Sequence, residues 1–143
     1  MRKMKNSKGF TLMEMLIVVA IIAILVAIMI PSVTSALEKS RESADAANIR
    51  AAYAEVMTDA LTGETTGLTD NGAYKVTYAN GVYTAVIPMT QKQAGWQNTT
   101  ITNIAGQSTA TGNELAKVAH NMDVTITYTE ATNAVTFTVT AHA

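Results

Sequence analysis

An uninterrupted run of apolar residues near the N-terminus dominates the hydropathy pattern of this chain. Every residue from Met15 to Ile30 is apolar, and Thr11 and Glu14 are the only polar residues in the short segment that leads into the run. At about 1.5 Å per residue, a helix over residues 10–30 would be roughly 30 Å long, the thickness of one hydrocarbon core. Such a helix lies in a bilayer, in a large core or against copies of itself. The rest of the chain is too small and too polar to bury it, so the pattern predicts a membrane-spanning or self-associating helix.

The helical pattern continues after Pro31. Proline lacks an amide hydrogen and its ring crowds the preceding turn, but within a membrane-embedded helix we expect a kink at this residue rather than an end. The sequence that follows is rich in alanine and contains no Gly or Pro before Gly63, which suits the end of a helix. Glu38, Arg41 and Glu42 are expected to keep this part of the helix soluble.

Two stripes of side chains run along this second part of the predicted helix. One is apolar, with spacings of four, three and four residues, and predicts the face that packs on the rest of the domain: Ile49, Tyr53, Val56 and Ala60. The other consists of small residues that would allow a neighbouring helix to approach closely: Ala44, Ala47, Ala51 and Ala54.

Alternation of apolar and polar residues predicts two antiparallel hairpins farther along the chain. The first surrounds Asn80-Gly81, a pair that suits a two-residue type I′ turn. Its register sets Tyr78 opposite Tyr83, Val76 opposite Ala85 and Tyr74 opposite Ile87. The second hairpin runs from Val124 to Val139 with a four-residue turn at 130–133, which places two apolar rows on one face.

The segment between the hairpins has a weaker pattern. Residues 99–104 suggest a short strand, residues 113–121 suggest a short helix with Leu115, Val118 and Ala119 facing inward, and Trp96 is expected to anchor local packing. The predicted fold class is therefore α+β. The second half of a long N-terminal helix covers the apolar face of an antiparallel sheet of about four strands.

Charge is distributed unevenly along the chain. The first nine residues carry four positive charges and no negative ones: Arg2, Lys3, Lys5 and Lys8. By the positive-inside rule, this basic start places the N-terminus in the cytoplasm. The remaining residues carry 6 Lys+Arg and 11 Asp+Glu, a net charge of −5, which argues against a nucleic-acid-binding surface dominated by net charge.

A secretory signal peptide would share the basic start and the apolar run. Cleavage of such a signal would fall after the run, near small residues such as Ser32 or Ala36. The apolar run is longer than the ~7–15 residues usual for a signal, and a helix-compatible sequence continues past Pro31. Both observations disfavour an ordinary signal peptide.

Glu14 is the one acidic residue in the apolar helix. A carboxylate near the start of a membrane span is costly unless it is neutralised or paired. It would be tolerated in the headgroup region, in protonated form, or beside the positive end of its own helix dipole. Alternatively, it pairs with a cation supplied at assembly. No Lys or Arg follows before Lys39, so the nearest candidate is an amine created by cutting the chain after Gly9.

These residues carry a resemblance to a known family. Lys8-Gly9, followed by Phe10-Thr11-Leu12-Met13-Glu14, the long apolar run and Pro31, resembles the N-terminus of type IV prepilins and their relatives. The resemblance implies that a prepilin peptidase cuts between Gly9 and Phe10 on the cytoplasmic face, and that Phe10 becomes the N-methylated N-terminus. It also implies that Glu14 neutralises the amine of a neighbouring subunit in the filament. The pilin fold agrees with the α+β fold read from the hydropathy pattern.

The resemblance predicts three segments. Residues 1–9 are a leader peptide that is removed, residues 10–31 are the transmembrane and filament-core helix, and residues 32–143 are an extracellular globular domain. The implied partners are other copies of the chain in a helical homopolymer, the prepilin peptidase and methyltransferase, and the platform protein and ATPase of the assembly machinery. The prepilin would reside in the cytoplasmic membrane and the assembled subunit in a pilus on the cell surface.

Two other functions remain open. A pseudopilin of a type II secretion or competence apparatus shares the N-terminal pattern, and a single-span anchor could display a binding domain outside the cell. The absence of cysteine, and so of the disulfide found in many Gram-negative pilins, leans weakly towards a pseudopilin or a Gram-positive source.

The sequence gives no indication of an enzyme, a cofactor or a metal site. His120 and Asp123 have only a weak ligand-like spacing, and His142 lies near the C-terminus, where mobility is expected. Asn98-Thr99-Thr100 matches the glycosylation sequon, a pattern that arises often by chance in a Thr-rich sequence.

Overall fold

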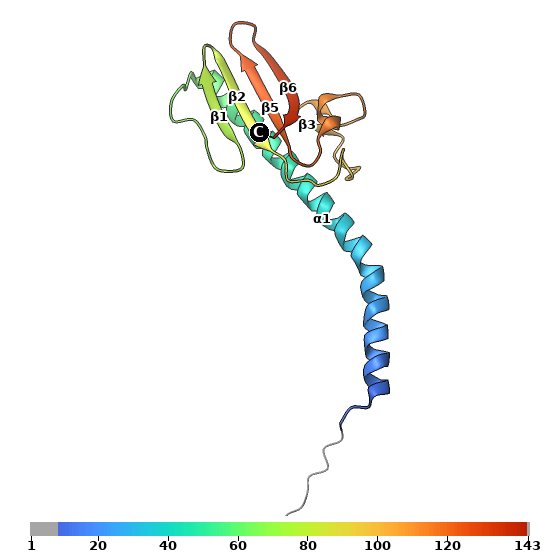
Figure 1. Cartoon of the computed structure of the whole chain (residues 1–143). Coiled ribbons are helices and arrows are strands. Elements are labelled where there is room, and N and C mark those ends of the chain that lie inside the picture. Colours follow the sequence, from blue (N-terminus) through green and yellow to red (C-terminus); the bar gives the residue numbers. More distant parts are fainter. Residues whose placement is uncertain (1–8, 143) are drawn as a thin grey trace, which may run out of the picture. The chain divides into compact units, whose positions relative to one another are not determined.

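The computed structural model describes residues 9–142 and divides into two compact units, Met1–Ala36 and Leu37–Ala143. Helix α1 (Leu12–Thr62) supplies the regular structure of the first unit and the first element of the second (Figure 1). The four basic residues of the predicted leader lie outside the described residues.

Helix α1 is continuous through Pro31, as the sequence predicted. It ends at Thr62, and Gly63 follows with a φ of +71°, the left-handed conformation in which glycine ends a helix without steric cost. The kink at Pro31 stays a prediction.

A four-stranded antiparallel sheet forms the centre of the second unit, with strand order β1-β2-β5-β6. Its strands are β1 (Lys75–Ala79), β2 (Val82–Pro88), β5 (Met122–Thr129) and β6 (Ala134–Ala141). The predicted α+β pilin fold is confirmed, because a long apolar N-terminal helix is followed by this sheet.

Both predicted hairpins form in the predicted register. Asn80 and Gly81 have positive φ angles of 53° and 78°, as a type I′ turn requires, and Tyr78 pairs with Tyr83. Strand β1 begins one residue after Tyr74, so the expected pair of Tyr74 with Ile87 lies outside the ladder. In the second hairpin the turn occupies residues 130–133, and the apolar rows pair as predicted: Val124 with Val139, Ile126 with Phe137 and Tyr128 with Val135.

The core of the second unit lies between α1 and the sheet. Ile49, Ala52 and Val56 of the helix are fully buried in one cluster with Tyr83, Ile87, Val124 and Ile126 of the sheet. Tyr53 stacks on Phe137, with the ring centroids 6.1 Å apart. Burying each large apolar side chain contributes about 1.5–3 kcal/mol, so this stripe supplies the cover that the sheet needs. The alanine stripe at residues 44, 47, 51 and 54 is exposed.

The segment between the hairpins is more irregular than predicted. The strand expected at 99–104 is reduced to β3 (Asn103–Ile104), which turns at Ala105-Gly106 and pairs with β4 (Gln107–Ser108). The helix expected at 113–121 is a single turn of 3₁₀ helix, η1 (Glu114–Lys117), because Val118 adopts an extended conformation with ψ 133°. Its inward residues Leu115 and Val118 are nevertheless fully buried.

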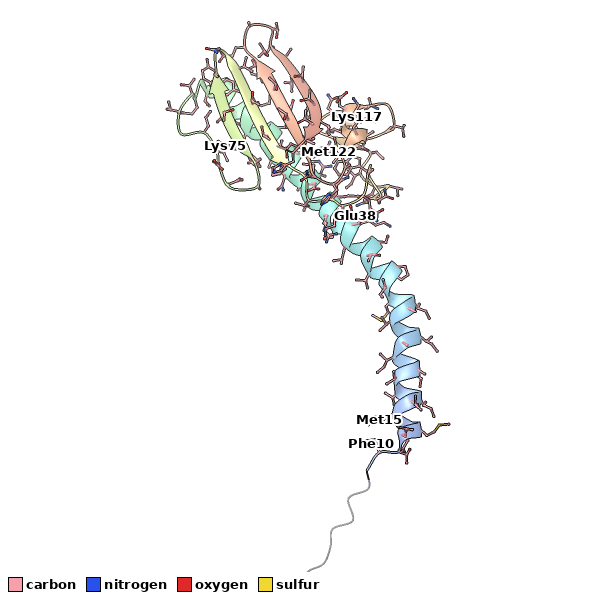
Figure 2. The ribbon with its side chains drawn as sticks, in the orientation of Figure 1. Phe10, Met15, Glu38, Lys75, Lys117 and Met122 are labelled. Carbon is pink, nitrogen blue, oxygen red and sulfur yellow. The ribbon has the colours of Figure 1, made fainter. Side chains whose placement is uncertain are left out.

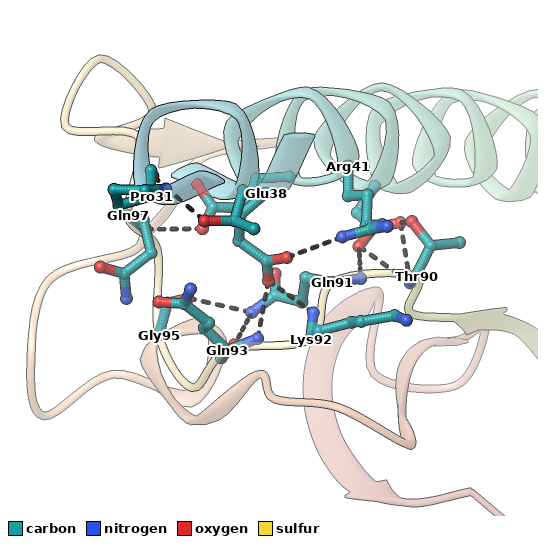
Figure 3. A network of polar contacts seen from close by, with 12 residues as sticks. Pro31, Glu38, Arg41, Thr90, Gln91, Lys92, Gln93, Gly95 and Gln97 are labelled. Carbon is teal, nitrogen blue, oxygen red and sulfur yellow. Dashed lines mark hydrogen bonds and ion pairs between the residues drawn. The ribbon is translucent and has the colours of Figure 1, made fainter. Parts of the chain in front are cut away.

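The expectation that Glu38 and Glu42 keep the helix soluble is wrong. Both are almost completely buried, and so is Asp45, one turn farther along the same face of α1. We refer to Glu38, Glu42 and Asp45 as the carboxylate row. Figure 3 shows Glu38 of this row facing the loop that follows β2.

The carboxylate row binds backbone amides of this loop. Asp45 accepts hydrogen bonds from the amides of Thr90 and Gln91, at 2.9 Å each. Six backbone N–H groups in total are bound by the row, in three adjacent pairs: Thr90 and Gln91, Lys92 and Gln93, Gln97 and Asn98. A buried carboxylate is stable where amides replace its water, which explains how charged residues occupy this face.

Glu38 also contacts a cation. Arg41 lies 3.2 Å from its carboxylate. Burial alone would raise the pKa of Glu38, but the amides of Gln93 and Lys92 together with Arg41 lower it below the ordinary value. The ionised form of Glu38 is therefore favoured in the folded domain.

Candidate functional site

The first described residues form the predicted processing site. Gly9 and Phe10 are exposed and precede the start of α1 at Leu12. A side chain built on Gly9 would meet no atom within 4 Å. Figure 2 shows Phe10 and Met15 at this end of the helix. Cleavage after Gly9 and methylation of Phe10 stay predictions.

Glu14 forms a capping box with Thr11. The Thr11 amide donates to Glu14 Oε2 at 2.7 Å, and the Glu14 amide donates to the Thr11 hydroxyl oxygen at 3.2 Å. The Thr11 hydroxyl also donates to the Glu14 carboxylate at 2.8 Å. These reciprocal bonds supply acceptors for backbone N–H groups that have no partner within the first turn of the helix. The sequence contained the T-x-x-E signal for this arrangement, but Thr11 was not singled out as a partner of Glu14.

No cation pairs with Glu14 within residues 9–142, where the four ion pairs of the structure all lie beyond residue 37. A hollow of about 510 Å³ is lined by Phe10, Glu14, Met15, Ile17 and Val18. Phe10 and Glu14 thus border the same apolar space. The predicted pairing of Glu14 with an amine in an assembly is not represented in a single uncut chain, and stays a prediction.

The apolar part of α1 is exposed along its whole length. Large apolar side chains are at least 46 % exposed at every such position from Phe10 to Val33. The helix is long and apolar enough to cross a membrane, and none of its most apolar stretch is buried within the described chain. Only three exposed large apolar residues lie elsewhere in the described chain: Leu37, Leu61 and Val86.

The surroundings of Pro31 include one compensating contact. The Thr34 hydroxyl donates to the carbonyl oxygens of Ile30 and Pro31, at 3.1 Å each. Because the hydroxyl donates to carbonyl oxygens of its own helix, it is not left unpaired when its surroundings are apolar. The helix therefore keeps its polar Thr34 satisfied beside the proline.

Both histidines are exposed. Asp123 pairs with His142, at 2.7 Å from its Nδ1, and not with His120, which is exposed. The His142 amide also donates to the carbonyl oxygen of Asn121, so a backbone hydrogen bond just beyond the ends of β5 and β6 attaches the residue that was expected to be mobile. Within residues 9–142 no group of three potential ligands is placed to hold a metal.

A long helix with an apolar, exposed first half and a second half packed on an antiparallel sheet is the fold of type IV pilins. The family model described as "Prokaryotic N-terminal methylation motif" matches residues 4–30. A 40-residue segment is 52% identical to the "Type IV wide pilus major component PilA4" of Thermus thermophilus. That segment is 28% of this chain and 30% of the relative, so the match spans less than a third of either protein. No solved structure matches the chain significantly. The two matches confirm the resemblance to the type IV pilin family that the N-terminal residues indicated.

Proposed function

We propose that this protein is a structural subunit of a type IV pilus, cut after Gly9 and polymerised through the apolar half of α1. The observation that carries the proposal is the continuous exposed apolar surface of residues 10–33, headed by a single carboxylate. Such a surface is stable in a bilayer and, after extraction, only against similar surfaces. A membrane before assembly and other copies of this helix afterwards supply both environments. The role is structural, not enzymatic.

Cleavage would change the surroundings of Glu14. In the uncut chain its carboxylate is bound by the amide and hydroxyl of Thr11. These bonds reduce the cost of a carboxylate near the membrane surface before assembly. Cleavage creates an amine on Phe10, which borders the same hollow as Glu14. In a filament, the amine of one subunit and the Glu14 of its neighbour would neutralise each other in an apolar interior, and would favour one axial register.

Substitutions at Glu14 and Thr11 separate pairing from capping. Glu14→Ala should be inserted and cut normally but should fail to form filaments without wild-type subunits, whereas Glu14→Asp should assemble partly. Thr11→Val is the matched control, because it removes the two hydrogen bonds of the Thr11 hydroxyl at a cost of about 0.5–2 kcal/mol and keeps the Glu14 carboxylate. It should lose much less filament than Glu14→Ala, measured as pilin in sheared filaments against total processed pilin. Abundant filaments of Glu14→Ala, or an equal loss in Thr11→Val, would contradict the pairing.

Processing is tested by the N-terminal mass of the protein from cells. We expect a chain that begins at N-methylated Phe10, and an uncut chain in Gly9→Val. Because a side chain at Gly9 meets no described atom, a block in this variant reflects recognition by the peptidase and not misfolding. Normal cutting of Gly9→Val would refute the site. Recovery of the mature protein in sheared surface filaments would separate a pilus subunit from a pseudopilin.

A further inference from the structure

A cleft on the second unit (Leu37–Ala143), called the outer unit below, is lined by one aromatic ring and several hydroxyl groups. Its cavity volume is about 310 Å³, close to the lower end of the range of roughly 300–1,000 Å³ usual for small-molecule sites. Its lining residues all belong to the irregular segment between the two hairpins, in and around β3 and β4. Its lining combines one indole, two aliphatic side chains and five hydroxyl or amide side chains: Trp96, Ile101, Ala110, Asn98, Thr99, Thr102, Ser108 and Thr109.

No charged side chain lines this cleft. The nearest carboxylate of the carboxylate row, Glu42, is fully buried, and its two oxygens are bound by the amides of Gln97 and Asn98. A phosphate, a carboxylate or an ammonium group would therefore find no counter-charge in the cleft. The lining selects a neutral ligand with both apolar and hydroxyl surfaces.

Trp96 is fixed as one wall of the cleft. Its indole Nε1–H donates to the carbonyl oxygen of Leu115 at 2.7 Å, and the ring is half-buried against the core. A ring held in this way offers an apolar surface at little entropic cost on binding. The C–H face of a sugar ring packs on such a surface, while the hydroxyls of the sugar point outward.

The hydroxyl groups of Thr99 and Thr102 are available to a ligand. Both residues are exposed, and neither side chain makes a hydrogen bond within the described chain. By contrast, the Thr109 hydroxyl donates to the carbonyl oxygen of Ile101 at 2.5 Å, and its amide donates to the carbonyl oxygen of Thr102 at 3.2 Å. These internal bonds hold the opposite walls together, so the free hydroxyls are presented by a preformed frame.

We propose that this cleft binds one ring of a neutral saccharide, with Trp96 against the sugar face and the hydroxyls of Thr99 and Thr102 on its edge. The proposal does not depend on cleavage or polymerisation, because all of the lining residues lie in the outer unit. A filament of such subunits would present the cleft many times, and weak binding at each cleft would add to strong attachment.

The test uses the full-length protein in a detergent that has no sugar headgroup. Trp96 is the single tryptophan, so its fluorescence reports on this cleft alone. The probes are methyl glycosides of neutral hexoses, deoxyhexoses and N-acetylhexosamines, with glucosamine and glucuronic acid as charged probes. Saturable fluorescence change and saturation-transfer NMR are expected with at least one neutral sugar and not with the charged ones.

Isosteric variants assign the signal to the cleft. Thr99→Val and Thr102→Val should each weaken binding roughly threefold to tenfold, the effect of one hydrogen bond. Thr136→Val, on an exposed position of β6, is the matched control and should bind as the wild type. Trp96→Phe should weaken binding by NMR. This variant also loses the bond to Leu115. If it fails to fold for that reason, the two threonine variants test the proposal. Absence of binding by every neutral sugar, equal binding of the charged probes, or unchanged binding in both threonine variants would overturn the proposal.

Discussion

The two parts of helix α1 reverse the usual relation between hydropathy and burial. Up to Ala36 the helix carries large apolar side chains, and all of them are exposed. From Leu37 onward, four acidic residues of the helix are among its buried residues: Glu38, Glu42, Asp45 and Asp59. The two parts belong to different units, so the contrast lies in the partners that each unit provides to its part of the helix.

The comparison shows that burial follows available partners more closely than hydropathy. The carboxylate row is buried because a loop more than forty residues away presents backbone amides to it. The apolar part has no partner among the described residues. Under the proposed function, its partner is another molecule, either lipid or further copies of the helix.

Truncation should produce the largest contrast between the two parts. A protein that begins near Ser35 keeps Ile49, Ala52 and Val56 in the core, and should be soluble, monomeric and cooperatively folded. A protein that begins at Gly63 loses these residues and the carboxylate row, so its sheet face should be exposed and it should aggregate. Size-exclusion chromatography and thermal unfolding give the measurement. Similar behaviour of the two proteins would mean that the helix does not cover the sheet.

Glu42→Gln should destabilise the protein that begins near Ser35 by about 1.5–3 kcal/mol. The carboxylate accepts the amides of Gln97 and Asn98 at 2.6 Å each, and a carboxamide would turn an N–H group towards one of those donors. Glu114→Gln is the control, because Glu114 forms only an exposed ion pair with Lys117. This substitution should change the free energy of unfolding by less than about 1 kcal/mol. Chemical denaturation measures both. A Glu42→Gln protein as stable as the control would show that the amides of the loop do not need the charge.

Glu38 should make the outer unit sensitive to acid. Its pKa is lowered in the folded state, so its contribution to stability is complete above the unfolded pKa of about 4.3 and is lost as the pH falls through the folded pKa. In Glu38→Gln the stability at pH 7 should be lower, and the further loss between neutral pH and pH values below about 4 should be smaller than in the wild type. Denaturation at a series of pH values tests this. Parallel pH profiles for the two proteins would exclude Glu38 as a source of acid sensitivity.

The features found from sequence were those with a local or periodic signal. Asn80-Gly81 specified a turn and thereby a register, and the 49–53–56 spacing identified the helix face that covers the sheet. The carboxylate row had no such signal. Glutamates at helical spacing are equally compatible with a solvated face, and only the amides of the loop distinguish the two environments.

The candidate site was predicted as residues but not as a geometry. Gly9, Phe10 and Glu14 stand out in one sequence, whereas the capping box joins Glu14 to Thr11 through bonds that depend on where the helix begins. The Asp123–His142 pair was missed because strands β5 and β6 bring together residues that lie 19 positions apart. Contacts that depend on sheet register follow from local sequence only once that register is known.

Among the four buried acids of α1, Asp59 is the one without amide partners in the described part of the chain. Its replacement should have the smallest effect on the free energy of unfolding, and should raise it where the replacement of Glu42 or Glu38 lowers it. Its Oδ2 atom is buried with no hydrogen-bond partner among the described residues. Burial, together with the nearby charges of Glu55 and Glu64, raises its pKa above the ordinary value. A raised pKa means that its favourable contribution is present below the unfolded pKa and is lost as the pH rises through the folded pKa. Asp59→Asn should therefore increase the stability at pH 7, and this gain should shrink in acid. The control is Asp70→Asn, at an exposed residue paired with Lys75, which should lose a little stability or none. A loss of stability at pH 7 in Asp59→Asn would show that its charge is compensated after all, and that all four buried acids of α1 have partners.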